Sequence, residues 1–208
     1  LKFDDYFVQE GLAFRFTPFN YKEWGDVEEG NGYAIDTEKL YENVMNRYKY
    51  GGLDTPGLYL DETTMRICYS HRRLFAQLAK ELVKQGDNAR AQKVLAYAEQ
   101  AIPAYNVPQV YESGSYDIAT AYASIGETGK AITLLNDLIS ESRDYIDWAF
   151  SLGDSRIEMV QRDCLYKFWQ WNQCNELLKD MDKERYKQSN QQFEEKYMRL
   201  AQLMNYQN

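Results

Sequence analysis

Long apolar runs are missing from this 208-residue sequence, and no stretch approaches the roughly 18 apolar residues that a membrane span requires. Basic residues are also too few for a general nucleic-acid binder, because 24 Lys and Arg stand against 32 Asp and Glu, for a formal net charge of -8. Such a binder needs a basic surface that displaces counterions from phosphate. The acidic balance also argues against docking on an anionic membrane. We expect neither nucleic acid nor a membrane surface as a partner of this chain itself.

Histidine and cysteine are scarce. The single His71 cannot build a His-based zinc site, and no cysteine cluster stands near it in the sequence. The three cysteines are an odd number without paired spacing and give no disulfide framework. We expect Cys68, Cys164 and Cys174 to be small apolar core residues, and we expect no metal and no cofactor.

Motifs that carry catalysis are missing as well. Gly126-Glu127-Thr128-Gly129 lacks the Lys-Ser/Thr of a phosphate-binding loop, and Ser113-Gly114-Ser115 lacks the first glycine of a nucleophile elbow. Glu62 and Arg66 have the spacing of a helical ion pair rather than of a catalytic dyad. No nucleophile stands with a base to activate it. We expect that this chain alone is not an enzyme.

Hydrophobic residues make up 44% of the chain, which is enough to bury a core. Residues 1–35 are crowded with aromatic side chains and interrupted by glycines. Leu12, Phe14 and Phe16 alternate with small or polar residues, a period of two that is typical of strands. The stretch is too short for a sheet of its own, and we expect an extended arm laid over a helical body.

From residue 36 onward the apolar spacing is helical. Asp36 or Thr37 can cap a first helix that ends at Gly51-Gly52. Asp61 can cap the next helix, which stops near Gly86.

An internal repeat is the most specific pattern in the chain. In residues 72–105 an apolar stripe precedes Gly86, a stripe of small residues around Leu95 follows it, and Pro103 ends the second helix. The pattern recurs over residues 113–145, at a spacing longer than the roughly 34 residues typical of tetratricopeptide (TPR) repeats. The repeat predicts an all-α fold of TPR-like antiparallel helical hairpins, an α-solenoid, with an N-terminal extended arm.

The rest of the helical domain, which we place at residues 36–182, is less regular. Residues 155–182 carry two successive apolar stripes without a glycine turn and predict a degenerate third unit. The second helix of the preceding unit is expected to run on toward residue 152. Residues 183–208 are polar but keep apolar residues at helical spacing, which predicts a terminal helix that caps the open end of the array.

Aromatic side chains are dense from Tyr166 to Trp171, and Tyr116 and Tyr122 add to them. Aromatic residues at such spacings more often fill the core of a helical repeat than form a platform for sugars. We therefore expect them in the core.

One segment of the arm resembles a known family. Large membrane proteins common in Bacteroidetes, grouped as domain of unknown function 2723 (DUF2723), contain a segment similar to Tyr6-Phe7-Val8-Gln9-Glu10-Gly11-Leu12-Ala13-Phe14-Arg15-Phe16-Thr17-Pro18. Further matching pieces are Tyr41-Glu42-Asn43-Val44-Met45-Asn46, then Tyr59-Leu60-Asp61-Glu62 with Met65-Arg66, then the hairpin from Gln85-Gly86-Asp87 to Pro103. The resemblance covers most of the chain and weakens after about residue 155.

The resemblance implies a parent protein with a many-span membrane region, similar to the GT-C class of lipid-linked sugar transferases and to protein O-mannosyltransferases. This chain would be the helical region that follows it, on the periplasmic face of the inner membrane, tethered in the full-length protein just before Leu1 and soluble as a separate piece. The chain begins without a leader pattern, and we expect it to be a piece of that larger protein. The acidic catalytic residues would lie in the missing membrane region, so no catalytic residue carries over.

The first functional hypothesis is a non-catalytic accessory domain that binds polypeptide. By analogy with TPR proteins, the concave face of the first helices would present Arg73, Lys80 and Lys84, followed by Tyr116, Thr120 and Ser124. The three cations make a basic patch that suits an acidic or C-terminal peptide. Alternatively, this face is merely solvated or is covered by the N-terminal arm.

Two other hypotheses remain open. The arm could contribute directly to glycosyl transfer by closing over the membrane active site, with Glu10 and Arg15 as the residues that matter; their structural alternative is a buried ion pair that fastens the arm. The chain could also be a purely structural or dimerisation scaffold, which exposed apolar patches on the last helix would favour.

Overall fold

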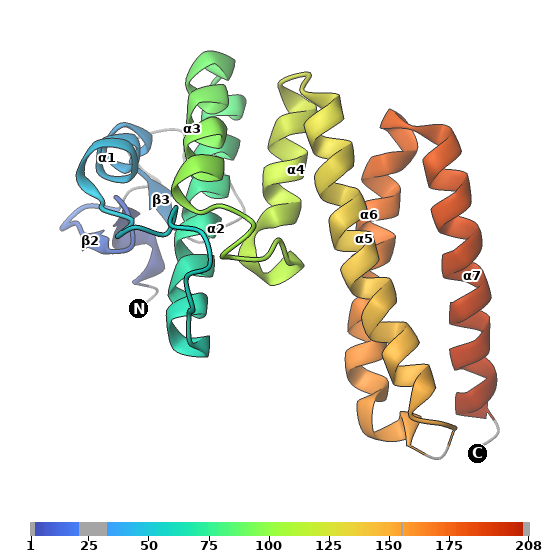
Figure 1. The fold of residues 1–208 in the computed structure, drawn as a ribbon. Coiled ribbons are helices and arrows are strands. Elements are labelled where there is room, and N and C mark those ends of the chain that lie inside the picture. The colour runs from blue at the N-terminus through green and yellow to red at the C-terminus, as the bar shows by residue number, and fades with distance from the viewer. Residues whose placement is uncertain (1–2, 21–32, 155, 206–208) are drawn as a thin grey trace. The chain divides into compact units, whose positions relative to one another are not determined.

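The computed structural model of the chain describes residues 3–20, 33–154 and 156–205. Its contacts divide the chain into two compact units, Leu1–Pro108 (unit 1) and Gln109–Asn208 (unit 2) (Figure 1). Helices make up most of the described residues in both units, so the predicted helical class is confirmed.

A small three-stranded sheet opens unit 1. Its middle strand β1 (Phe7–Gln9) runs antiparallel to β2 (Phe14–Phe16) and parallel to β3 (Ala34–Ile35). The expectation that residues 1–35 form no sheet is therefore wrong. Strand β3 completes the sheet on the free side of β1, and its two residues are too few to show a period in the sequence. Residues 21–32 of the predicted arm lie outside the described part of the chain.

Helix α1 (Thr37–Glu42) begins at Asp36, as the sequence predicts. The Asp36 carboxylate accepts the backbone N–H of Lys39 at 3.1 Å and so satisfies one of the free donors of the first turn. The helix continues into a π-helical turn, Asn43–Arg47. Such wider turns are rare and often occur at functional sites.

The chain leaves this helix earlier than the sequence predicts. The backbone of Tyr48 is extended, so the predicted end at Gly51-Gly52 is wrong by about one turn. Its own N–H still donates to the carbonyl of Asn43 at 2.9 Å. The extended backbone directs the Tyr48 phenol to the backbone N–H of Leu12, a long-range contact that local spacing does not reveal.

Helices α2 (Glu62–Lys84) and α3 (Asn88–Ala101) form an antiparallel pair in unit 1 (Figure 1). Asp61 caps α2 as predicted, with its carboxylate 3.0 Å from the backbone nitrogen of Thr64. Gly86 forms the predicted bend with a φ of 77°, a left-handed conformation that glycine adopts without a steric penalty. The predicted apolar stripes are buried: Phe75, Leu78, Ala79, Leu82, Ala91, Leu95 and Ala98.

Arg72 of α2 is buried, with 1% of its surface exposed. Its guanidinium donates to the carbonyl oxygens of Ile102 at 3.2 Å, Val107 at 2.6 Å and Pro108 at 2.7 Å. Burial lowers the pKa of Arg72 to about 10. Because a guanidinium carries five donors in a fixed plane, one side chain can hold several turns of the connection after α3 against α2.

Unit 2 begins with a short 3₁₀ turn, Tyr111–Ser113, followed by α4 (Ser115–Ser124). Gly126 forms the predicted bend to α5 (Thr128–Ser151), with a φ of 85°. The length of α5 confirms the prediction that the second helix of this pair runs on.

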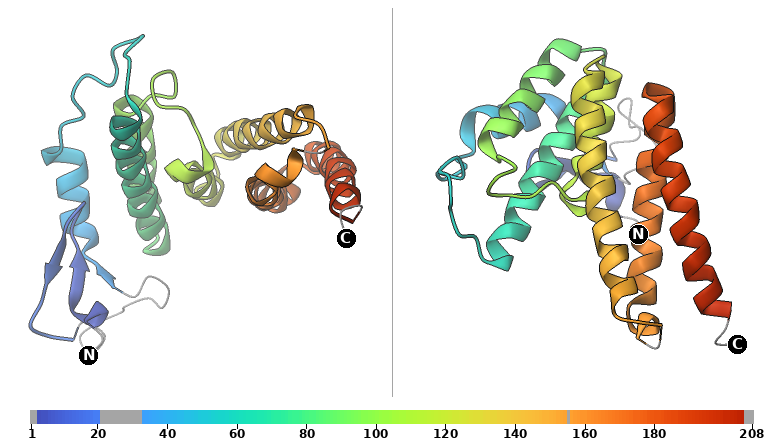
Figure 2. Two further views of the ribbon diagram at one scale, coloured as in Figure 1. Left: turned by 90° about the horizontal axis from the view of Figure 1, so that it is seen from below. Right: turned by 45° about the vertical axis from the view of Figure 1, so that its right-hand side comes forward.

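Helix α6 (Gln161–Met181) is one continuous helix after a 3₁₀ turn, Ile157–Val160. The two successive helices predicted within residues 155–182 are therefore wrong. Helix α6 packs against α5 on one side and α7 (Lys183–Asn205) on the other, as the near end-on view of the three helices shows (Figure 2). A helix buried on two sides carries two apolar stripes, which in the sequence resemble two separate helices.

Candidate functional site

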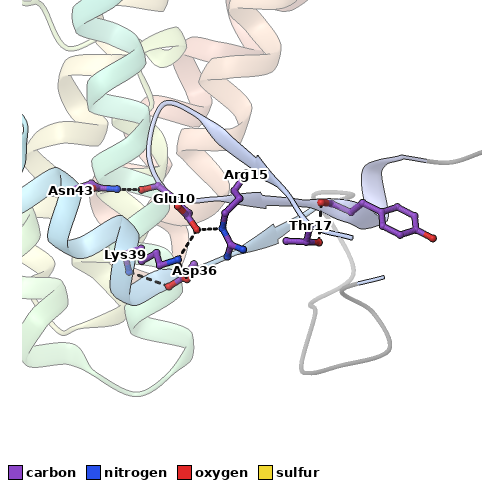
Figure 3. Close-up of polar contacts among 7 residues, drawn as sticks. Glu10, Arg15, Thr17, Asp36, Lys39 and Asn43 are labelled. Atoms are coloured by element: carbon purple, nitrogen blue, oxygen red, sulfur yellow. Dashed lines mark hydrogen bonds and ion pairs between the residues drawn. The ribbon is translucent and has the colours of Figure 1, made fainter. Parts of the chain in front are cut away.

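The arm motif places a group of charged side chains where the sheet meets α1 (Figure 3). The Glu10 carboxylate accepts from Lys39 Nζ at 2.9 Å and from Arg15 Nε. Asn43 Nδ2 donates to the backbone carbonyl of Glu10 at 2.7 Å. The hydrogen bond from Lys39, followed by those interactions with Arg15, lowers the pKa of Glu10. Glu10 thus joins β2, α1 and the π-helical turn at one point.

This group of charges is open to solvent. Arg15 and Lys39 expose about half of their side chains, and Glu10 exposes 23%. The predicted burial of the Glu10–Arg15 ion pair is therefore wrong, because Arg15 lies on the edge strand β2, all of whose residues are exposed. The ion pair itself is present, and its contacts are those of a clasp that fastens the arm to α1.

Tyr48 adds a second fastening to the same loop. Its phenol oxygen accepts the backbone N–H of Leu12 at 3.0 Å. The Tyr48 ring lies edge-on to the His71 imidazole, and Tyr50 contacts that imidazole from another side, with centroid distances of 5.8 and 5.4 Å. Burial lowers the pKa of His71. His71, expected to be structural, is a half-buried ring of α2 that packs against Tyr48 and Tyr50 of the segment after α1.

A cavity of about 260 Å³ lies beside these rings, and Tyr48, Tyr50 and Tyr97 contribute to its wall. Tyr50 donates its hydroxyl to the carbonyl of Val44 at 2.9 Å, and burial raises the pKa of Tyr50. The sequence did not reveal this cavity, because its residues come from the segment after α1 and from α3.

The predicted basic residues of unit 1 share one face of α2. Arg73, Lys80 and Lys84 are spaced seven and four residues apart, which places them on one side of a helix. Arg73 donates to Ser70 Oγ at 3.0 Å, and Lys84 pairs with Glu81 at 2.9 Å.

The arm reaches the rim of this basic face. Gln77, on the same side of α2, lies 3.5 Å from the hydroxyl of Tyr33, just before β3. Tyr33 in turn lies edge-on to Phe14 of β2. Lys80 and Lys84 stay exposed, so partial cover by the arm leaves most of the basic face open.

The predicted residues of unit 2 follow one another on α4. Thr120 Oγ1 donates to the carbonyl of Tyr116 at 3.0 Å, and Ser124 Oγ donates to the carbonyl of Thr120 at 2.9 Å. The Tyr116 ring stacks on Tyr111 at a centroid distance of 5.2 Å. The structure thus places Tyr116, Thr120 and Ser124 in unit 2 and the cations Arg73, Lys80 and Lys84 in unit 1. That the two sets share one binding face stays a prediction.

The aromatic residues of α6 divide into two groups. Phe168 and Trp171 are buried, which confirms their predicted place in the core. Tyr166 and Trp169 are about half exposed, so the prediction is wrong for them. They stack on each other at 5.6 Å, and Trp169 also meets Tyr111 edge-on at 5.3 Å.

A larger groove of about 660 Å³ runs between α5 and α7 in unit 2. Its lining is polar and includes Asn136, Asp137, Arg143, Arg185 and Gln192. The sequence does not reveal this groove, because its two walls are distant in the chain and the polar residues of α7 fit a terminal cap equally well. The available signal was a run of polar residues at helical spacing on one side of α7.

The three cysteines are buried and free, as predicted. Burial raises the pKa of each thiol, and that of Cys174 to about 12, which keeps it in the unreactive protonated form. Within the described ranges, no three His, Cys, Asp or Glu side chains gather as a metal site would require.

Comparison with family models, curated proteins and solved structures finds no match to this chain. None of the helices in the described part of the chain combines the length and apolar character needed to cross a membrane.

Proposed function

We propose that this chain is a non-catalytic, TPR-like interaction module that binds polypeptide, and that it is the periplasm-facing accessory region of a membrane-embedded, glycosyltransferase-like protein of the DUF2723 type. The helix pairs α2–α3 and α4–α5 support the TPR-like α-solenoid, because each bends at the glycine that the repeat indicated. The family assignment is supported by sequence motifs alone, of which the segment around Glu10 is the most specific.

The observation that carries the binding function is the basic face of α2 on a chain with a net charge of -8. Among the described residues, Lys80 makes no hydrogen bond or ion pair, and its side chain is exposed. A lysine of this kind can pair with a ligand carboxylate without first breaking an internal contact. Arg73 and Lys84 flank it and extend the positive potential along the helix, which suits an acidic peptide.

Fluorescence polarisation with two synthetic decapeptides tests this function, one of alternating Glu and Ser and one of alternating Gln and Ser. We expect the acidic peptide to bind at least about tenfold more tightly and to weaken as salt rises, because the contacts are exposed charges. Lys80→Glu, and more strongly Lys80→Glu with Lys84→Glu, should reduce that affinity about tenfold or more.

Lys93→Glu is the matched control, because Lys93 is an exposed lysine of unit 1 that lies on α3 instead of α2. It makes the same change in net charge and should alter the affinity by less than about twofold. Equal losses for Lys80→Glu and Lys93→Glu would show that net charge alone governs binding, and no preference for the acidic peptide would remove the basic face as a site.

A dimerisation scaffold is a second candidate, favoured by two exposed apolar side chains on α7. Tyr197 exposes 45% of its surface and Met198 exposes 62%. The mass in solution tests it: a dimer that Met198→Lys converts to a monomer would support the scaffold, and a wild-type monomer would exclude it.

The sequence immediately upstream of Leu1 tests the parent assignment. We expect several membrane spans with an early pair of acidic residues. A preceding region without such spans would overturn both the family and the periplasmic placement, while leaving the peptide-binding test unaffected.

The direct contribution of the arm to glycosyl transfer receives no support from the geometry. The Glu10 carboxylate already forms ion pairs with Arg15 and Lys39. These contacts support the role of Glu10 and Arg15 in fastening the arm.

A further inference from the structure

The groove between α5 and α7 has a defined register. Arg143 Nη1 donates to Gln192 Oε1 at 3.5 Å, and Lys196 pairs with Asp147 one turn further along both helices. The two partners are separated by the same number of residues in both contacts. The contacts therefore advance in the same direction along α5 and α7, and the two helices run parallel along this stretch. From the contact between Arg143 and Gln192 the groove extends toward the N-terminal end of each helix. Asn136 and Arg185 line its far end.

The two arginines of the groove stand at different levels. Arg143 is seven residues from Asn136, the level that corresponds to Arg185, and seven residues of helix rise about 10 Å. Arg143 donates to Ser140 Oγ at 3.0 Å and pairs with Asp144 at 3.8 Å. Arg185 pairs with Asp182 at 3.1 Å, in the preceding turn of the chain. Arg185 is thus held away from Arg143. Two guanidinium groups in this arrangement fit an elongated ligand better than one small anion.

Asp137 is an exposed carboxylate in the lining of the groove. It lies near the Arg185 end, and its partial burial raises its pKa. No hydrogen bond or ion pair joins it to another described residue. A ligand that displaces water from the groove must therefore bring hydrogen-bond donors to Asp137 and acceptors to the arginines.

The neutral side chains of the groove can also both donate and accept hydrogen bonds. Asn136, Gln188 and Gln192 carry carboxamides, which both donate and accept as a peptide group does.

The base of the groove is also incompletely bonded. Ser189 lines the groove, accepts the indole N–H of Trp171 at 2.8 Å, and donates to Asn175 Oδ1 at 2.6 Å. Asn175 is fully buried, and its Nδ2 has no hydrogen-bond partner among the described residues. Hydrogen-bonding capacity under the groove is therefore left unused by the chain.

We propose that the groove between α5 and α7 binds an extended polypeptide segment, with its backbone on the carboxamides and an acidic side chain on Arg143 or Arg185. The main chain of a peptide supplies donors and acceptors alternately, as Asp137 and the two arginines require. The roughly 10 Å between the two arginine levels equals about three residues of extended chain. This site lies wholly in unit 2 and is independent of the basic face of α2, although it extends the proposed binding of polypeptide.

Selection from a displayed library of random dodecapeptides tests the site. We expect the selected peptides to be enriched in Asp or Glu and to bind the protein in fluorescence polarisation. Binding should shift the indole N–H resonance of Trp171 in an ¹⁵N spectrum, because that group bonds to Ser189 in the wall of the groove. The indole resonance of Trp148, which lies outside the groove lining, should move less.

Two variants of α7 give a matched comparison. Gln188→Trp fills the groove, whereas Lys187→Trp places the same bulk about 100° round the same helix, at a residue outside the groove lining, and both side chains are exposed in the wild type. We expect the first to weaken the selected peptides at least about tenfold and the second by less than about twofold. Arg185→Gln should weaken acidic peptides selectively, and circular dichroism checks that each variant is folded.

Equal binding to both tryptophan variants would overturn the proposal, as would a library without enrichment. A shift of the Trp171 resonance by maltoheptaose or cellohexaose, without any peptide enriched, would identify a glycan groove instead and would also overturn it. Lys80→Glu should leave the selected peptides unaffected, so this site and the basic face of α2 can fail separately.

Discussion

The phenol oxygen of Tyr48 occupies the space that a side chain on Gly11 would need. A Cβ built on Gly11 would lie 2.1 Å from Tyr48 Oη, far closer than any van der Waals contact. The same oxygen accepts the backbone N–H of Leu12 at 3.0 Å. The loop between β1 and β2 can therefore dock on the segment after α1 only when residue 11 has no side chain.

We expect Gly11→Ala to lower the free energy of unfolding by about 1–3 kcal/mol, because the added methyl group must displace the Tyr48 ring. Tyr48→Phe should cost about 1 kcal/mol, since it removes the acceptor for Leu12. The double variant should cost less than the sum, because the phenylalanine leaves room for the methyl group. Urea unfolding of the four proteins measures this coupling, and strictly additive costs would show that the two residues do not interact.

Arg72 is buried, whereas the next residue, Arg73, is exposed. Arg72→Met should destabilise unit 1 by about 3 kcal/mol or more, because it leaves the carbonyls of Ile102, Val107 and Pro108 without their donor in a buried place. Arg73→Met, on the exposed side of the same helix, should change stability by less than about 0.5 kcal/mol. Thermal unfolding compares them, and similar losses for both would contradict the structural role of Arg72.

Local signals made much of the helical part predictable. A carboxylate one residue before a helix, as at Asp36 and Asp61, and a glycine between two apolar stripes, as at Gly86 and Gly126, depend only on nearby backbone groups. Their positions in the structure match the prediction.

Wrong and missing predictions both arise where distant residues decide the structure. Arg72 stands beside a histidine and another arginine in the sequence, and only the fold supplies the carbonyls that allow its burial. The end of the first helix depends on the contact between Tyr48 and Leu12, and the groove of unit 2 depends on which helix packs beside α5. None of these follows from periodicity along one segment.

His71 should make stability depend on pH. Burial between aromatic rings lowers the pKa of His71, so the folded state disfavours its protonated form. The stability contributed by the neutral ring is complete above the unfolded pKa of about 6.5 and is lost as the pH falls from there through the folded pKa.

The difference in unfolding free energy between the wild type and His71→Gln isolates this effect. We expect the advantage of the wild type to shrink between about pH 7 and pH 5. Other titrating groups, including Asp137, are common to both proteins and cancel. A constant difference over this range would mean that the ring titrates as it does in water.

Glu10 should make stability depend on pH in a more acidic range than His71 does. Its pKa is lowered by the hydrogen bond from Lys39 and then by Arg15, so its contribution is present above the unfolded value of 4.5 and is lost as the pH falls below it. Glu10→Gln should cost less than about 1 kcal/mol at neutral pH, because the ion pairs are exposed, and almost nothing at about pH 3.

Urea unfolding at the two pH values checks the Glu10 prediction. A loss well above 2 kcal/mol at neutral pH would contradict a solvent-exposed clasp. Lost transferase activity of the proposed full-length parent, with unchanged stability of this region, would instead favour the alternative hypothesis in which the arm takes part in glycosyl transfer.

Three glycines should respond to alanine with opposite signs. Gly86 and Gly126 have φ values of 77° and 85°, where an L side chain costs about 1–2 kcal/mol, although nothing crowds the added Cβ. Gly129 lies in the first turn of α5 with an ordinary backbone and open space around it. Gly129→Ala should therefore raise stability by up to about 1 kcal/mol, because alanine loses less chain entropy in a helix. A gain in stability from Gly86→Ala or Gly126→Ala would show that these glycines do not form the turns between paired helices. The paired-helix interpretation, on which the proposed binding function depends, would then fail.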